Sequence, residues 1–318
     1  MSRIILAPME GLADDILRDC LTRIGGIDLC VTEFVRVTTQ LLPPKVFKRL
    51  CPELVNGCKT PAGVPVRIQL LGSDPQALAA NAVRALELGS PGIDLNFGCP
   101  AKTVNRSQGG AVLLQEPNRV AHIVATVRRA IGDDAWLSAK MRLGFSTKDL
   151  ALDNAKGIED AGADELTVHA RTKVEGYRPP AHWHWVEKIR QHVDIPVIAN
   201  GEVWTPADYI ACKQVSGSDD VMIGRGLVWK PDLALQISHQ QKHQPSTPWD
   251  WSALIPTVLY FIDLVEQQVE IKYQDARIKQ WLKLLGRVYP QANTCFEQGK
   301  RLKTLHELRL LVAHSELP

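Results

Sequence analysis

The sequence predicts an α/β fold in which eight strand–helix units close into a TIM (β/α)8 barrel, followed by a C-terminal all-helical domain. Three observations support it: eight short apolar runs, helical patterns between them, and polar residues at the C-terminal end of nearly every run. The eight units occupy about 230 of the 318 residues, within the size range of such barrels. A doubly wound sheet does not require polar residues at so many strand ends, so the barrel is the better interpretation.

The apolar runs are five to eight residues long, as buried parallel strands are. They lie at residues 4–8, 29–34, 66–72, 93–98, 137–144, 165–171, 196–202 and 220–226. Between them, residues 74–89 carry alanine and leucine at helical spacing, with Gly89 as the stop. A second clear helical pattern spans residues 116–132 and stops at Gly132. This alternation is typical of repeated strand–helix units around a parallel sheet.

The ends of the runs carry side chains that a purely structural strand does not need. They are Met9 and Glu10, Glu33, Gln69, Asn96 with Cys99, Lys140 with Arg142, His169, Asn200, and Gly224 with Arg225. Each alone has an ordinary structural explanation, such as a buried core histidine or a loop cap. In a barrel all these ends converge on one mouth, where the active site lies. Their convergence therefore favours a binding site.

The last two runs predict a phosphate site. They end in "IANGEV" and "IGRG", and the loops after the seventh and eighth strands of such barrels often bind phosphate through glycine N–H groups. Asn200, Gly201 and Gly224 fit that role, with Arg225 as the cation. The dinucleotide pattern G-x-G-x-x-G is absent here, so FMN is favoured over tightly bound NAD.

The position of Lys140 at a strand end indicates where the ring of a flavin would lie. A buried ammonium needs a partner, and a reduced flavin offers the negative charge that develops around N1 and O2. Gln69 and Asn96 are expected at the amide edge of the ring. The segment beside it is expected to comprise Pro8, Met9, Glu10 and Gly11.

Several motifs together resemble the flavin-dependent tRNA dihydrouridine synthases. "APMEGLADDILR" is similar to their flavin motif, "LNFGCPAKTVNRSQGGAVLL" to their cysteine loop, and "IANGE" with "MIGRG" to their phosphate-binding strand ends. "TEFVRV", "HARTKVEGYR" and "ARIKQWLKLL" resemble the bacterial C-type subgroup, which reduces uridine 16 of the D-loop. The resemblance spans the whole chain and implies tRNA as substrate, FMN as cofactor and NADPH or NADH as reductant.

The resemblance also implies a role for Cys99. Flavin N5 delivers hydride to C6 of the uracil, and the enolate that results needs a proton at C5, for which Cys99 is the expected general acid. Pro100 favours an extended backbone at Cys99, which would hold the thiol in place. The alternative is an inert buried cysteine.

Further roles follow from the same resemblance. His169 and Glu202 are expected at the cofactor, with Arg171 near its phosphate. Asn96, Arg142 and Tyr177 suit the uridine, although the sequence does not assign them individually, and Arg36 is expected to contact tRNA at the barrel mouth.

The C-terminal part is predicted to be a tRNA-binding domain, so that residues 1–240 form the catalytic barrel and residues 241–318 the helical domain. Residues 271–318 carry nine Lys and Arg against four Asp and Glu, a net charge of +5, which leaves −3 for the first 270. Ile278, Trp281, Leu282 and Leu285 fall on one face of a helix, with Lys272, Lys279, Lys283 and Arg287 on another. An ordinary solvated face is the alternative. The resemblance favours RNA contacts by Arg277, Lys279, Gln280 and Arg301.

The composition limits the remaining classes. With 45% hydrophobic and 23% charged residues and no long apolar segment, we expect a cytoplasmic protein with no membrane partner. Seven scattered cysteines without a C-x-x-C predict neither disulfides nor a zinc site, and we discount the pairs His182/His184 and His239/His243 as metal ligands. A monomer is expected. The alternatives are a small-molecule flavin oxidoreductase of the dihydroorotate dehydrogenase kind and a catalytically inactive RNA-binding barrel.

Overall fold

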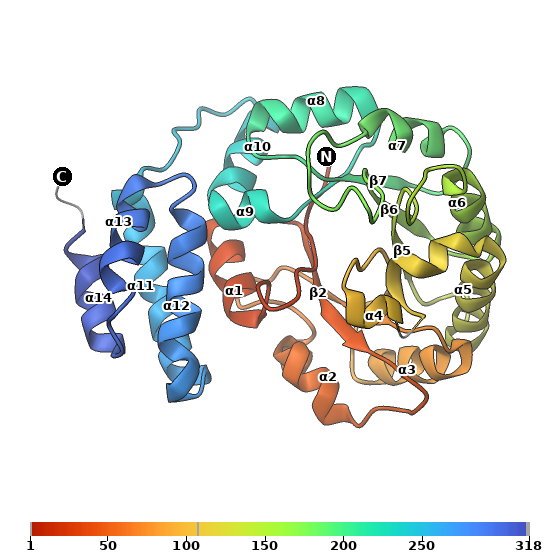
Figure 1. The fold of residues 1–318 in the computed structure, drawn as a ribbon, viewed down its shortest axis with the longest axis horizontal. Helices are drawn as coiled ribbons and strands as arrows, with labels where there is room; N and C mark the ends of the chain where they lie inside the picture. Colours follow the sequence, from red (N-terminus) through yellow and green to blue (C-terminus); the bar gives the residue numbers. More distant parts are fainter. Residues whose placement is uncertain (1, 107, 316–318) are drawn as a thin grey trace. The chain divides into compact units, whose positions relative to one another are not determined.

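The chain contains a closed barrel of eight parallel strands (Figure 1). The computed structural model describes residues 2–106 and 108–315. Consecutive strands are neighbours around the barrel, and the eighth pairs with the first. The strands are β1 (Ile4–Leu6), β2 (Leu29–Arg36), β3 (Val66–Leu71), β4 (Ile93–Phe97), β5 (Leu137–Arg142), β6 (Glu165–His169), β7 (Val197–Asn200) and β8 (Val221–Ile223). The predicted fold class and its eight strands are confirmed.

The described residues form two compact units. The first comprises the residues up to Asp15 and those from Ile27 to Gly224. The second comprises Ile16 to Gly26 and the residues from Arg225 onward. Most of α1 (Asp15–Ile24) therefore belongs to the second unit.

The helices of the first unit surround its barrel, except the short helix at Lys102–Arg106, which lies in the loop after β4 (Figure 1). They are α2 (Pro44–Leu50), α3 (Pro75–Glu87), α4 (Lys102–Arg106), α5 (Pro117–Ile131), α6 (Ala151–Asp160), α7 (Trp183–Arg190) and α8 (Pro206–Ser216), with 3-10 turns η1 (Pro52–Asn56) and η2 (Gly110–Gln115). The Asp74 carboxylate caps α3 by accepting from the N–H of Ala77 at 2.8 Å, and Pro75 occupies the first turn. The two helices predicted at 74–89 and 116–132 are α3 and α5.

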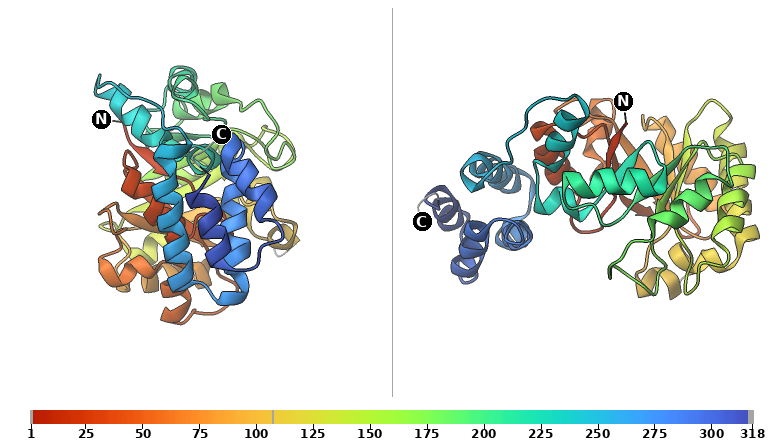
Figure 2. Two further views of the ribbon diagram at one scale, coloured as in Figure 1. Left: turned by 90° about the vertical axis from the view of Figure 1, so that its left-hand side faces the viewer. Right: turned by 90° about the horizontal axis from the view of Figure 1, so that it is seen from above.

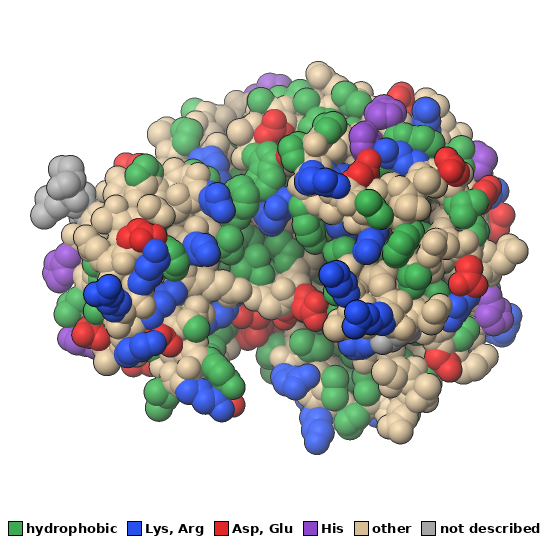
Figure 3. Space-filling view, in the orientation of Figure 1, with side chains coloured by type: hydrophobic (Ala, Val, Ile, Leu, Met, Phe, Trp, Pro, Cys, Tyr) green, Lys and Arg blue, Asp and Glu red, His purple; other side chains and the backbone are tan. Residues whose placement is uncertain are grey.

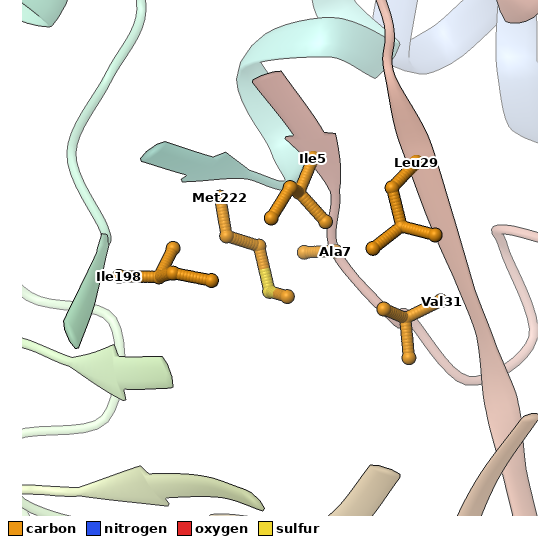
Figure 4. Packing of buried hydrophobic residues seen from close by; sticks show 6 residues of the cluster. All are labelled: Ile5, Ala7, Leu29, Val31, Ile198 and Met222. Carbon is orange, nitrogen blue, oxygen red and sulfur yellow. The ribbon is translucent and has the colours of Figure 1, made fainter. Parts of the chain in front are cut away.

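The inside of the barrel is half apolar and half polar. Six side chains from β1, β2, β7, β8 and the residue after β1 pack together in its apolar half (Figure 4): Ile5, Ala7, Leu29, Val31, Ile198 and Met222. The polar half comes from β3 to β6. There Arg67 donates to Ser138 Oγ at 3.0 Å and to Glu165 Oε1 at 2.9 Å, and all three residues are buried. The apolar half packs as a core, whereas the polar half holds a hydrogen-bonded network.

The second unit is helical, as predicted for the C-terminal part. Its remaining helices are α9 (Arg225–Trp229), α10 (Leu233–Gln241), α11 (Trp251–Gln268), α12 (Ile271–Leu285), α13 (Pro290–Gly299) and α14 (Leu305–Ala313). Figures 1 and 2 show α11 to α14 side by side, and α11 contacts both α12 and α14. The predicted apolar face of α12 is buried at Ile278, Trp281, Leu282 and Leu285. In the described part of the chain, every helix is too short or too polar to cross a membrane.

The eighth apolar run is shorter as a strand than predicted. β8 ends at Ile223, and Arg225 begins α9 instead of continuing the strand. Position 224 lies close to Ala7 and Met9, since a Cβ there would stand 3.6 Å from Ala7 Cβ and 3.4 Å from Met9 Sδ. These are ordinary van der Waals distances, so position 224 packs against the end of β1 without requiring glycine.

Candidate active site

The strand register brings the predicted polar residues to one end of the barrel. Asn96 on β4 pairs with Lys140 on β5, and Lys140 pairs with Thr167 on β6. Two residues further along, Arg142 pairs with His169, and His169 pairs with Asn200 on β7. Register partners on parallel strands point to the same side of the sheet. The structure therefore brings together side chains from four consecutive strands.

The loop after β4 holds Cys99 through hydrogen bonds on both sides of the residue. Asn96 Oδ1 accepts from the N–H of Gly98 at 2.8 Å and from that of Cys99 at 2.9 Å. The Cys99 carbonyl accepts from Asn105 Nδ2 at 3.0 Å and from the N–H of Ala111 at 3.1 Å. These contacts fix the backbone from which the thiol projects.

The Cys99 thiol is mostly buried. The residue is 7% exposed and packs with Leu71 and Val104, with Phe34 and Ala101 beside them. Burial raises the pKa of the thiol above its ordinary value. Cys99 is therefore protonated at neutral pH, which suits a proton donor and not a nucleophile.

Gln69 and Asn96 are joined by their side-chain amides. Asn96 Nδ2 donates to Gln69 Oε1 at 2.7 Å, and Gln69 Nε2 donates to Asp94 Oδ2 at 2.7 Å. Asn96 Oδ1 already accepts from two backbone N–H groups of the cysteine loop. One Nδ2 hydrogen remains for any contact with uridine, because an amide nitrogen carries two.

Lys140 lies beside this pair on β5. Burial, together with the charge of Arg142, lowers the pKa of Lys140 to about 8, although Asp94 opposes the shift. Arg142 places a second positive charge two residues from Lys140 in sequence, so the two charges together favour an anionic ligand over a neutral one. Lys140 and the Gln69–Asn96 amides are thus a donor set that fits the polar edge of a flavin ring.

Arg142 links two loops at the mouth. Its Nε donates to Gly98 O at 2.9 Å, and its NH1 donates to Thr172 O at 3.0 Å and Gly176 O at 2.9 Å. Its guanidinium carbon lies 5.2 Å from the ring centroid of Tyr177, which is 53% exposed. Two of the three residues predicted near the uridine, Arg142 and Tyr177, are therefore in contact, and Arg142 also ties the β4 loop to the β6 loop.

The predicted phosphate end of β7 contains a paired acid. Glu202 forms an ion pair with Arg171, and Trp204 Nε1 donates to Glu202 Oε1 at 3.1 Å. A Cβ at Gly201 would stand 3.3 Å from the imidazole of His169, and the φ of Gly201 is +120°. Glycine is required there because His169 needs the space and the backbone is left-handed. Asn200 Nδ2 donates to Met222 O at 2.8 Å and so joins β7 to β8.

The loop after β1 is a tight turn. The carbonyl of Met9 accepts from the N–H groups of Leu12 and Ala13 at 3.0 and 2.9 Å. Gly11 has a φ of +70°, and its N–H donates to Glu33. Pro8 and Met9 are half-buried, whereas Glu10 is exposed.

Arg225 and the predicted RNA contacts of the tail lie in the second unit. Arg225 is 5.7 Å from the ring centroid of Trp229. On α12, Arg277 NH1 donates to Gln280 Oε1 at 3.0 Å, and Arg301 is exposed beyond α13. Figure 3 shows Lys and Arg side chains gathered over these helices. Arg36, in the first unit, is exposed and donates to Thr103 O at 3.4 Å.

Lys279 is more enclosed than its predicted role suggests. Its Nζ contacts Asp275 at 2.8 Å and donates to Leu302 O at 2.6 Å. Its ammonium thus joins α12 to the segment after α13, which also carries Arg301.

Two further residues organise the site, and neither was predicted from the sequence. Asp94 accepts from Gln69 and from Ser138 Oγ, the latter at 2.6 Å, and its position two residues before Asn96 was the available signal. Glu175 accepts from Thr172 N at 2.6 Å and Lys148 Nζ at 2.9 Å. Although burial opposes it, these bonds lower the pKa of Glu175 to about 2. Glu175 holds the loop that presents Tyr177. Among the described residues, no group of three or more His, Cys, Asp or Glu is placed to hold a metal ion.

A parallel eight-stranded barrel with converging polar strand ends and a buried loop cysteine defines an α/β-barrel enzyme. The chain belongs to the dihydrouridine synthase family, because the family model described as "Dihydrouridine synthase (Dus)" matches residues 5–308. Membership of this family implies a flavin cofactor, which the donor set around Lys140 fits.

The chain is similar over nearly its whole length to tRNA-dihydrouridine(16) synthases. It is 52% identical to that of Aquipseudomonas alcaligenes over 98% of this chain and 99% of the relative. It is 54% identical to that of Pseudomonas putida over 94% of this chain and 93% of the relative.

Solved structures of other barrel enzymes are more distantly similar. A 2-naphthoyl-CoA reductase complex has a TM-score of 0.57 at 15% identity and covers 76% of this chain and 50% of its own. A variant of morphinone reductase in complex with tetrahydroNAD has a TM-score of 0.53 at 13% identity, covering 79% and 89%. At these identities the likeness concerns the fold alone.

Proposed function

We propose that the chain reduces uridine 16 of tRNA to 5,6-dihydrouridine, with FMN as its flavin and NADPH or NADH as the reductant. The observation that carries the proposal is the buried Cys99 thiol in the loop after β4, where the backbone N–H of Cys99 donates to Asn96. The relatives named tRNA-dihydrouridine(16) synthases support the choice of uridine 16.

The chemistry requires a hydride and a proton. A flavin bound here would supply hydride to C6 of the uracil, whose C5=C6 bond is conjugated with the C4 carbonyl. Cys99 donates its Sγ proton to C5, and the thiolate left behind is stabilised by the nearby charges of Arg142 and Arg36. The thiol must be protonated at the start of each turnover, which its burial favours.

The residues that would hold the flavin divide into two groups. Lys140 and Gln69 would contact the ring edge, beside the segment Pro8 to Gly11 with Met9 and Glu10. His169, Asn200, Gly201, Glu202, Gly224 and Arg225 would hold the ribityl phosphate end. The Arg171–Glu202 ion pair supports this, since the paired arginine offsets the repulsion between the Glu202 carboxylate and a phosphate.

The uridine would be held by Asn96, Arg142 and Tyr177. The base must leave the tRNA stack to reach the mouth, which costs a few kcal/mol and requires a binding surface. Arg36 at the mouth and Arg277, Lys279, Gln280 and Arg301 in the tail would supply it. The barrel domain would then comprise residues 1–240 and the tRNA-binding domain residues 241–318. We place the reaction in the cytoplasm and expect a monomer.

The experiment that tests this function uses tRNA from a strain lacking the gene. Purified protein with FMN and NADPH is expected to introduce dihydrouridine at position 16, mapped by mass spectrometry of nuclease fragments. Dihydrouridine at another position contradicts the assignment of uridine 16. Absence of the product in every tRNA, with flavin bound and reduced, contradicts the proposed substrate.

A further inference from the structure

The polar half of the barrel contains a continuous hydrogen-bonded chain that ends at the cysteine loop. Ser138 Oγ donates to Asp94 Oδ1 at 2.6 Å, and Gln69 Nε2 donates to Asp94 Oδ2 at 2.7 Å. Asn96 Nδ2 donates to Gln69 Oε1 at 2.7 Å, and the N–H of Cys99 donates to Asn96 Oδ1 at 2.9 Å. Every bond in this chain is 2.9 Å or shorter.

The pKa of the Asp94 carboxyl is raised above its ordinary value. Burial raises the pKa of the carboxyl, whereas the bonds from Ser138 and Gln69 and the positive charges of Arg67 and Lys140 act to lower it. Oδ2 accepts from Gln69, and Oδ1 bonds to the Ser138 hydroxyl, which can donate to a carboxylate or accept from a protonated carboxyl.

The two ends of the chain permit a single orientation of both amides. Asp94 Oδ2 is an acceptor in this arrangement, so Gln69 turns its nitrogen toward Asp94. Its oxygen then faces Asn96, which must present Nδ2. The oxygen of Asn96 is thereby directed at the N–H groups of Gly98 and Cys99, which are donors. A reversed amide anywhere in the chain would oppose two donors or two acceptors.

We propose that Asp94 is a positioning residue for Cys99, acting through the ordered amides of Gln69 and Asn96; this inference rests on the proposed function, in which Cys99 is the proton donor. Asp94 is 1% exposed and Gln69 fully buried, so water does not compete for these bonds. Asp94 thus acts on the backbone N–H of Cys99 from five residues away in sequence. It holds the thiol donor in place without touching the substrate.

The conservative variant Asp94→Asn separates orientation from charge. The introduced amide can still present its oxygen to Gln69 if its nitrogen donates to Ser138, whose hydroxyl then turns toward Ile93 O at 3.4 Å. The positive charge of Lys140 loses its neighbouring carboxylate in both Asp94→Asn and Asp94→Ala. An effect present in Asp94→Ala and absent from Asp94→Asn therefore reports amide orientation and not the charge near Lys140.

The direct readout is hydrogen exchange at the amides of Gly98 and Cys99, followed by mass spectrometry with fragment-level resolution on the FMN-loaded protein. Asp94→Ala is expected to speed exchange at both amides about two- to tenfold, the range carried by one hydrogen bond. Asp94→Asn is expected to remain near wild type. The matched control Thr32→Val removes a buried hydroxyl that contacts the Gln69 backbone N–H at 3.1 Å but lies outside the chain, and it should leave both amides unchanged.

A double-mutant cycle tests whether the effect passes through Asn96. Asn96→Ala should itself speed exchange, and adding Asp94→Ala should then produce no further change. The kcat for tRNA is expected to fall further in Asp94→Ala than in Asp94→Asn.

Two results would overturn the inference: wild-type exchange in Asp94→Ala, or an equal effect of Asp94→Ala with and without Asn96. If Asp94→Ala does not fold, Gln69→Met breaks the same chain at its middle and should speed exchange in the same way. Wild-type exchange in Gln69→Met also overturns the inference. The exchange measurement needs no tRNA, so it tests the positioning by Asp94 independently of the reaction. An active Cys99→Ala enzyme would contradict the role of Cys99 as the acid without changing the exchange result.

Discussion

The guanidinium of Arg142 donates from Nε to the carbonyl oxygen of Gly98 at 2.9 Å, one residue before Cys99. The same side chain reaches two carbonyls of the β6 loop, so a single residue holds two loops together. The cysteine loop is thereby held at the Gly98 carbonyl by Arg142 and at the N–H groups of Gly98 and Cys99 by Asn96.

Arg142→Gln should slow uridine reduction and lower thermal stability. A hydrogen bond from a charged group is worth roughly 1.5 to 3 kcal/mol, so kcat should fall about ten- to a hundredfold. Single-turnover kinetics with tRNA measure the change. Arg84→Gln is the control, since Arg84 is partly exposed and pairs with Glu87 at 3.3 Å within α3. A wild-type rate in Arg142→Gln would show that the link between the loops is dispensable.

Cys99→Ala should lose uridine reduction and keep flavin chemistry. Loss of a general acid typically costs about a hundred- to ten-thousand-fold. Flavin content and the rate of flavin reduction by NADPH should stay near wild type, as measured by absorbance in stopped flow. Cys295→Ala, at another buried cysteine, serves as the control and should retain uridine reduction. Dihydrouridine formation by Cys99→Ala at the normal rate would exclude Cys99 as the acid.

Flavin affinity should depend on the protonation of Lys140. Its pKa is lowered to about 8 by burial, so the ammonium is present below that pH and is lost as pH rises through it. Affinity for FMN should therefore fall above about pH 8, because the cationic form attracts the electron-rich ring edge. Fluorescence titrations of the apoprotein across this range measure it. Lys140→Met should bind more weakly without that step, whereas Lys156→Met, on α6, should behave as wild type; a pH-independent wild type would contradict the role.

Much of the site follows from local sequence. Strand ends in a parallel barrel converge by geometry, so His169 and Asn200 were predictable from the ends of their runs, and their register pairing places them side by side. Asp94 was overlooked because it stands within an apolar run. Its role depends on Gln69 and Ser138, which are 25 and 44 residues away. Such contacts depend on tertiary structure, and no local pattern indicates them.

The tail shows the same limit. Helical spacing predicted the buried face of α12, including Trp281, because that pattern is local. The contact of Lys279 with the carbonyl of Leu302, 23 residues away, depends on how the helices pack. Spacing alone placed Lys279 with the cationic stripe, and whether it contacts tRNA stays a prediction.

Arg225→Ala should weaken FMN retention if Arg225 binds the phosphate. The loss of a charge-assisted hydrogen bond corresponds to roughly 1.5 to 3 kcal/mol, about ten- to a hundredfold in Kd. Equilibrium dialysis of the apoprotein against FMN measures it. Arg287→Ala is a matched control, since Arg287 lies 5.8 Å from the centroid of the same Trp229 ring. Equal Kd values for Arg225→Ala and wild type would place the phosphate elsewhere.

Replacing Arg277 and Arg301 together by alanine should weaken tRNA binding. Each phosphate interaction that the substitutions remove should make the log-log salt dependence shallower by about 0.7 to 0.9. Filter binding over a salt series measures this, and flavin reduction by NADPH should not change. Arg309→Ala is the control, because Arg309 pairs with Asp263 and with Glu266.

Lys279→Ala should be measured as a separate single variant in that salt series, because its effect on tRNA binding is combined with an effect on stability. It should also lower the melting temperature, because Lys279 joins α12 to the segment that carries Arg301. Unchanged tRNA affinity of the Arg277/Arg301 double variant at every salt concentration would make the tail a structural cap and direct the search to Arg36.

The division of the barrel interior into an apolar and a polar half also shapes how the fold responds to temperature. Exposing apolar surface raises the heat capacity of unfolding by about 0.45 cal/K/mol/Å², whereas exposing polar surface lowers it by about 0.26. Arg67, Ser138 and Glu165 occupy positions that an apolar barrel would fill with aliphatic side chains. Their exposure on unfolding reduces the heat-capacity change, so the stability curve is flatter than that of an aliphatic barrel of equal size. At equal maximum stability, the flatter curve broadens the range of temperatures over which the geometry of the site persists.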